Sequence, residues 1–224
     1  YGADNVRLWV ASVDWENDVP LNAVYKNGKF VKDELFEQNT ETYRRIRNTL
    51  RILLANLYDF DPAKDTVSPN QMTLVDRWIL ERLHQVTAGC REAYDVFEFR
   101  KVFAELNQFC AVDLSALYVD LTKDRMYCDA PDSVRRRATQ TAMHEVFETF
   151  ARLVAPILAY TADEAWEFAG HKDSIHLESF PEPNSAFSGT EATETVEQLL
   201  RIRDAVQAKI DEAIKAGDFK KRER

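Results

Sequence analysis

Residues 43–57 of this chain read YRRIRNTLRILLANL, and this stretch gives the clearest evidence for the fold class. Its apolar residues recur at steps of three and four, at Tyr43, Ile46, Leu50, Leu53, Leu54 and Leu57. That spacing gathers them on one face of an α-helix. We therefore predict an amphipathic helix over residues 32–58.

The same period recurs along most of the chain. It predicts further helices over residues 4–13, 74–94, 98–127, 134–158, 161–170 and 191–216. We expect the helix over 4–13 to be mostly buried. Thr73 with Asp76, Ser133, and Thr161 with Glu164 supply side-chain caps, the last pair as a capping box. Residues 59–70 and 171–190 contain prolines and polar residues and are predicted to be irregular.

One short segment departs from the helical pattern. Asn27-Gly28 suits a tight turn, because both residue types tolerate positive φ, and β-forming residues flank it. We predict a small β-hairpin near residues 24–31. With only 6 Gly and 7 Pro in 224 residues, however, the chain is poor in turns. The fold class predicted is all-α, an antiparallel helical bundle with this hairpin inserted.

The predicted organisation has three parts. A connector helix and the hairpin occupy 1–31, the bundle occupies 32–170, and an irregular segment with a final amphipathic helix occupies 171–224. The chain opens on Tyr1 rather than methionine and closes on a basic run at 220–224 without a finished element. We expect it to be a segment of a longer protein. No apolar stretch is long enough for a membrane span, and no signal peptide opens the chain.

No familiar catalytic motif is present. The glycines are isolated, so no phosphate-binding loop exists, and no GxSxG elbow occurs. Cys90, Cys110 and Cys128 form no CxxC pair, and we expect buried free thiols in a reducing compartment. His171 and His176 have no accompanying cysteine or acidic ligand pattern. We predict neither catalytic nor metal-binding residues in this chain.

The net charge of −9 means that any contact with nucleic acid must use local basic patches. Arg44, Arg47 and Arg51 form one such patch, a stripe beside the apolar face of their helix. A second cluster contains Lys123, Arg125, Arg135, Arg136 and Arg137. Its three consecutive arginines in a first helical turn oppose the helix dipole, which suggests a partner that supplies negative charge. Ordinary solvation and ion pairing remain the alternative for both patches.

Several stretches together resemble a known family. Residues 1–12 (YGADNVRLWVAS) are similar to the segment just after the KMSKS loop of class I aminoacyl-tRNA synthetases, in the form typical of isoleucyl-tRNA synthetases. Residues 43–51 and 113–128 resemble two helices of the anticodon-binding bundle of that family. Residues 153–158 (LVAPIL) and 161–166 (TADEAW) also fit, so the resemblance extends from residue 1 to about 182.

The resemblance implies a noncatalytic, tRNA-binding piece of a ligase that attaches isoleucine to its tRNA. The HIGH and KMSKS nucleotide-binding motifs are not in this sequence, so no cofactor is expected in the fragment. The whole enzyme would use ATP and Mg²⁺, and many members also bind Zn²⁺. The expected partners are isoleucine tRNA and the catalytic domain of the same polypeptide, with no membrane contact, in a cytoplasmic monomer. Between Val19 and Tyr43 the chain is longer than the members of that family, and we assign the extra length to the hairpin. We expect a surface insertion with no role, and contact with the neighbouring catalytic domain or with the tRNA is the alternative. The alternative function is a helical scaffold that binds proteins through the helix from Glu191 on.

Overall fold

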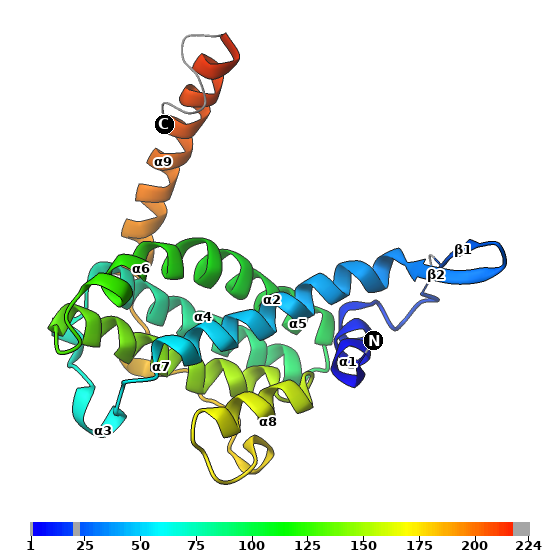
Figure 1. The fold of residues 1–224 in the computed structure, drawn as a ribbon, viewed down its shortest axis with the longest axis horizontal. Coiled ribbons are helices and arrows are strands. Elements are labelled where there is room, and N and C mark those ends of the chain that lie inside the picture. The colour runs from blue at the N-terminus through cyan, green and yellow to red at the C-terminus, as the bar shows by residue number, and fades with distance from the viewer. Residues whose placement is uncertain (1, 20–22, 217–224) are drawn as a thin grey trace.

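The stretch YRRIRNTLRILLANL lies in α2 (Glu34–Asn56), which confirms the helix predicted over 32–58. Figure 1 shows this computed structural model, which describes residues 2–19 and 23–216, with α2 crossing the molecule along its long axis. The remaining elements are α1 (Ala3–Ser12), β1 (Ala23–Lys26), β2 (Lys29–Asp33), α3 (Pro62–Asp65), η1 (Pro69–Gln71), α4 (Leu74–Asp95), α5 (Phe99–Gln108), η2 (Phe109–Tyr118), α6 (Val119–Cys128), α7 (Val134–Val154), α8 (Ala159–Phe168), η3 (Ile175–Leu177), η4 (Ser185–Phe187) and α9 (Glu191–Ala216).

The predicted all-α bundle is confirmed. Its core lies between α2, α4, α7 and the long helix formed by α5, η2 and α6. The π-helical η2 continues α5 into α6, since the residues at both junctions keep right-handed helical backbone angles. The largest fully buried side chains include Tyr118, Phe109, Phe147 and Phe150. None of the described helices is both long and apolar enough to cross a bilayer.

Some local predictions need correction. The region predicted to be an irregular loop over 59–70 contains the short helices α3 and η1. On α1, Leu8 is buried, but Val6 and Val10 are exposed, so this helix is less buried than predicted. Cys128 is exposed, whereas Cys90 and Cys110 are buried thiols as predicted. Tyr1 and the basic run at 220–224 lie outside the described residues.

Two of the three predicted helix caps are confirmed, and the third is wrong. Thr73 and Asp76 form a capping box at the start of α4, and the Ser133 hydroxyl accepts a hydrogen bond from the Arg136 amide at the start of α7. The box of Thr161 with Glu164 does not form, because α8 already begins at Ala159. The Asp4 carboxylate of α1 instead accepts bonds from the amides of Tyr160 and Thr161. The preceding helix, α7, was predicted to reach residue 158 and ends at Val154.

The hairpin is formed as predicted. Strands β1 and β2 are antiparallel, with Tyr25 opposite Phe30 and Lys26 opposite Lys29. Asn27 and Gly28 have φ values of 51° and 73°, as a type I′ turn requires. β2 runs directly into α2, and the hairpin extends beyond that end of the bundle (Figure 1).

Helix α9 also projects from the bundle (Figure 1). Its first turn is fixed by Glu81 of α4, whose carboxylate accepts hydrogen bonds from the backbone amides of Ala192 and Thr193. Val196 is the last fully buried residue along it. The division of the chain into parts at 1–31, 32–170 and 171–224 stays a prediction.

Candidate nucleic-acid interface

The three arginines of the first stripe lie on the exposed face of α2. Ile46, Leu50 and Leu53 on the opposite face enter the core, which fixes the direction of the helix. Arg44 pairs with Glu41 at 2.5 Å, and Arg47 pairs with Glu164 of α8 at 3.1 Å. These two ion pairs are solvent-exposed and therefore weak. Arg51 is exposed and has no ion pair with another residue that the structure describes.

A groove runs between α2 and α8 along this stripe. Its first part has a volume of about 890 Å³ and is lined by Glu37, Glu41, Arg44 and Tyr160, among others. Its second part has a volume of about 470 Å³ and is lined by Leu50, Arg51, Leu54, Ala55, Ala165 and Phe168. Arg47, Thr161 and Glu164 line both parts, so the two parts adjoin at these residues.

The two parts of the groove differ in charge. Acidic side chains outnumber basic ones in the first part, where Asp4, Glu37, Glu41 and Glu164 face only two arginines. The second part contains Arg47 and Arg51 against Glu164 alone, beside an apolar wall. A phosphate therefore meets its most favourable surroundings at the Arg47–Arg51 end, because guanidinium groups match its oxygens in charge and geometry.

Two exposed aromatic side chains line the groove, and sequence reasoning missed both. Tyr160 is 72% exposed and Phe168 is 78% exposed, at opposite ends of α8. Such rings offer flat faces on which unpaired bases stack. Their positions along the helix identify them as exposed. The buried face of α8 consists of Thr161, Ala162, Ala165 and Trp166, and neither ring lies on that face.

The second basic cluster is placed differently. Arg136 is only 4% exposed and donates hydrogen bonds to both carboxylate oxygens of Asp59. Arg137 contacts Asp59 and Asp65, and Arg125 contacts buried Asp76. The negative partner that this cluster needs is thus supplied by the chain itself. The hydrogen bond from Arg136 lowers the pKa of Asp59, which keeps that carboxylate ionised.

Arg136 is therefore buried, and Arg125 and Arg137 are mostly covered, with 15% and 16% of their side chains exposed. Lys123 and Arg135 remain exposed, and they pair with Asp120 at 2.8 Å and Asp129 at 2.5 Å. They lie on α6 and α7 and do not line the groove between α2 and α8. The structure thus does not bring the two predicted clusters together in one site.

The histidines have structural partners. The ring of His171 stacks on Trp166 with centroids 3.7 Å apart, and its Nε2 lies 2.9 Å from Glu148. His176 lies 3.1 Å from the Ala159 carbonyl oxygen. Within residues 2–19 and 23–216, no group of three or more His, Cys, Asp or Glu side chains is arranged to hold a metal ion.

Comparison with known proteins places the chain in a family. Residues 76–223 match the family model described as the anticodon-binding domain of tRNA ligase, so the chain belongs to that family. Over 84% of its length it also superposes on 20% of the LeuRS chain in a ternary complex of Agrobacterium radiobacter LeuRS with tRNA and LeuAMS, with a TM-score of 0.53 and 16% identity. At that identity the likeness shows the shared fold.

The resemblance to isoleucyl-tRNA synthetases is also confirmed. The chain is 39% identical to the isoleucine–tRNA ligase of Persephonella marina, over 95% of this chain and 22% of that protein. It is 42% identical to that of Geobacillus kaustophilus, over 96% of this chain and 22% of the relative. The chain thus spans less than a quarter of the relatives that it matches.

Proposed function

We propose that this chain binds the anticodon stem-loop of an isoleucine tRNA as part of an isoleucine–tRNA ligase. The family match and the identity of about 40% to several such ligases support this assignment. The ligase as a whole attaches isoleucine to its tRNA with ATP and Mg²⁺, and with Zn²⁺ in members that carry a zinc-binding tail. The catalytic domain of the same polypeptide is the second partner, and the enzyme acts as a cytoplasmic monomer.

The observation that carries the proposal is the composition of the second part of the groove. Arg47 and Arg51 lie there beside the exposed ring of Phe168. Recognition of an RNA loop needs phosphate contacts for placement and stacking or edge contacts for the bases. Both kinds of group therefore meet in one place. The arginines supply the first contact, and the aromatic ring supplies the second.

A tRNA titration at low and moderate salt tests the proposal. The parent should bind isoleucine tRNA with an affinity that falls as salt rises, because neutralised phosphates release counterions. The double variant Arg47→Glu, Arg51→Glu should bind at least about tenfold more weakly while keeping its helical circular dichroism. The matched control is Arg201→Glu, Arg203→Glu on α9, which changes the net charge equally at exposed positions.

The control separates a local contact from a general charge effect. If both double variants lose the same affinity, the groove has no special part in binding. If the parent binds no tRNA at low salt, the proposed function is wrong.

A second candidate function is a scaffold that binds another protein along α9. Leu199, Ile202 and Val206 are more than half exposed on this helix and recur at three- and four-residue steps. An apolar stripe of this kind is typical of helices that dock into a groove of a partner. This function predicts a protein-dependent shift in size on a gel-filtration column and no affinity for tRNA.

A further inference from the structure

The β-hairpin carries a net positive charge, because β1 and β2 together contain three lysines and one acidic residue, Asp33 at the end of β2. Between Val19 and Lys32 the sequence contains three lysines and no acidic residue, in a chain whose net charge is −9. Lys26 and Lys29 are exposed, and neither has an ion pair or hydrogen bond with another described residue. The hairpin is therefore a local cationic projection from an acidic protein.

The two lysines are held side by side by the turn. Lys26 and Lys29 are directly opposite each other across the antiparallel strands, next to Asn27-Gly28. Like charges in such a cross-strand pair destabilise a hairpin. A polyanion that binds both ammonium groups would remove this repulsion.

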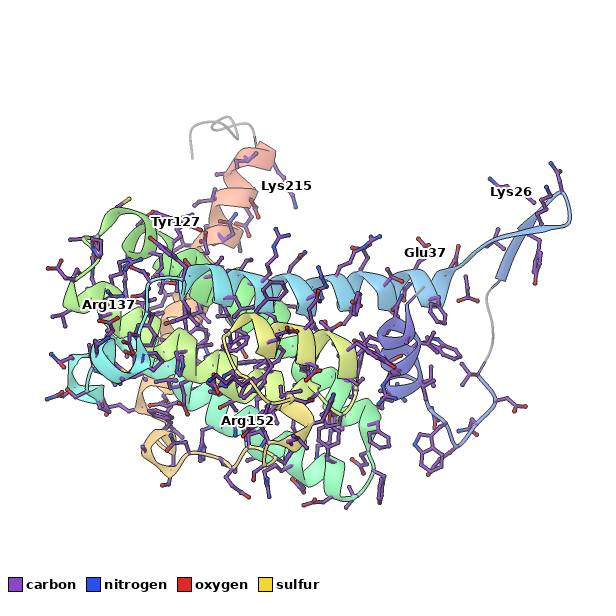
Figure 2. All side chains as sticks on the ribbon, turned by 60° about the horizontal axis from the view of Figure 1, so that its bottom comes forward. Lys26, Glu37, Tyr127, Arg137, Arg152 and Lys215 are labelled. Carbon is purple, nitrogen blue, oxygen red and sulfur yellow. The ribbon has the colours of Figure 1, made fainter. Side chains whose placement is uncertain are left out.

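The position of the hairpin fits an extended ligand. Figure 2 shows Lys26 at the far tip of the projection, well beyond Glu37 in the first turns of α2. The helical rise of 1.5 Å per residue places the hairpin end of α2 about 26 Å from Arg51. The acidic residues Glu34 and Glu37 lie between the hairpin and the Arg47–Arg51 end of the groove. The molecule thus presents two separate positive areas along one helix.

From this arrangement we infer that the hairpin is a second RNA contact, which binds the phosphate backbone of the same tRNA outside its anticodon arm. The inference rests on the proposed function, since it needs a tRNA seated in the groove between α2 and α8. The hairpin lysines bind phosphates without reading sequence, and they hold the long axis of the RNA parallel to α2. The exposed ring of Tyr25 extends the surface that faces the RNA.

The test compares two RNAs and two matched variants. The hairpin variant is Lys26→Gln, Lys29→Gln, and the control is Lys209→Gln, Lys215→Gln, which removes the same charge from exposed positions of α9. Each is titrated with whole isoleucine tRNA and with its isolated anticodon stem-loop over a range of salt. For whole tRNA, the hairpin variant should bind about tenfold more weakly at low salt, with a salt slope lower by about 2. The control should match the parent, and all three proteins should bind the short stem-loop equally.

Three other results contradict the inference, and they are distinguishable. If the parent binds whole tRNA and the hairpin variant binds it with the same affinity and slope, the hairpin does not contact RNA. If the hairpin variant loses as much affinity for the stem-loop as for whole tRNA, the hairpin contacts the anticodon arm itself, which contradicts the contact outside that arm inferred from the length of α2. Absence of binding by the parent to either RNA would overturn the proposed function and this inference with it.

Discussion

The carboxylate of Asp4 accepts a hydrogen bond from the backbone amide of Thr161 at 2.7 Å, across 157 residues of sequence. It also accepts bonds from the Tyr160 amide and the Thr161 hydroxyl. A negative group at a helix N-terminus accepts hydrogen bonds from the free amides and is attracted to the positive end of the helix dipole. Asp4 thus fixes α8, one wall of the groove, to the first helix of the chain.

Replacing Asp4 with Ala should destabilise the fold by about 1–2 kcal/mol, because the amides at the start of α8 lose a buried acceptor. Urea denaturation followed by circular dichroism measures this change. Asp124→Ala is the control, since Asp124 is exposed on α6 and caps no helix. If Asp4→Ala lowers the free energy of unfolding no more than Asp124→Ala does, water replaces the Asp4 carboxylate as the acceptor at no cost in stability.

Arg136→Met tests the structural role assigned to the buried member of the second basic cluster. Loss of this side chain leaves Asp59 without its main partner, so we expect destabilisation of at least about 2 kcal/mol. Arg135→Met removes an exposed ion pair and should destabilise the fold much less than Arg136→Met does. Both variants, once folded, should bind tRNA almost as the parent does. A large loss of affinity in Arg136→Met with unchanged stability would contradict the role given to it here.

The three thiols should differ in reactivity. Burial raises the pKa of Cys90 and of Cys110 to about 12, so both remain protonated and shielded at neutral pH. Cys128 is exposed at the end of α6. An aromatic disulfide reagent should therefore label one thiol in the native chain and three in denaturant, and Cys128→Ser should abolish the native reaction. Rapid labelling of two thiols in the native chain would show that the core opens locally.

Periodicity alone predicted the fold well, because it depends on local sequence. The stripe through Ile46, Leu50 and Leu53 and the Asn27-Gly28 turn are both properties of neighbouring residues. The start of α8 was mispredicted because its cap, Asp4, comes from the opposite end of the sequence. The burial of Arg136 could not be read from the sequence for the same reason, since its partner Asp59 lies 77 residues away. Charge patterns show which residues are basic, whereas only the tertiary structure shows which charges are already neutralised.

The exposed ring of Phe168 provides the sharpest test of how the groove recognises RNA. Phe168 is 78% exposed, so its replacement by Ala should change stability by less than about 0.5 kcal/mol. Stacking of one base on an aromatic ring contributes about 1–3 kcal/mol to binding, so affinity for isoleucine tRNA should fall about tenfold. Tyr127→Ala is the matched control, because Tyr127 (Figure 2) is equally exposed on α6 and is not among the residues that line either part of the groove. Phe168→Leu, which keeps apolar area but has no ring, should behave like Phe168→Ala. If Phe168→Leu instead binds like the parent, the side chain acts through apolar contact rather than through stacking.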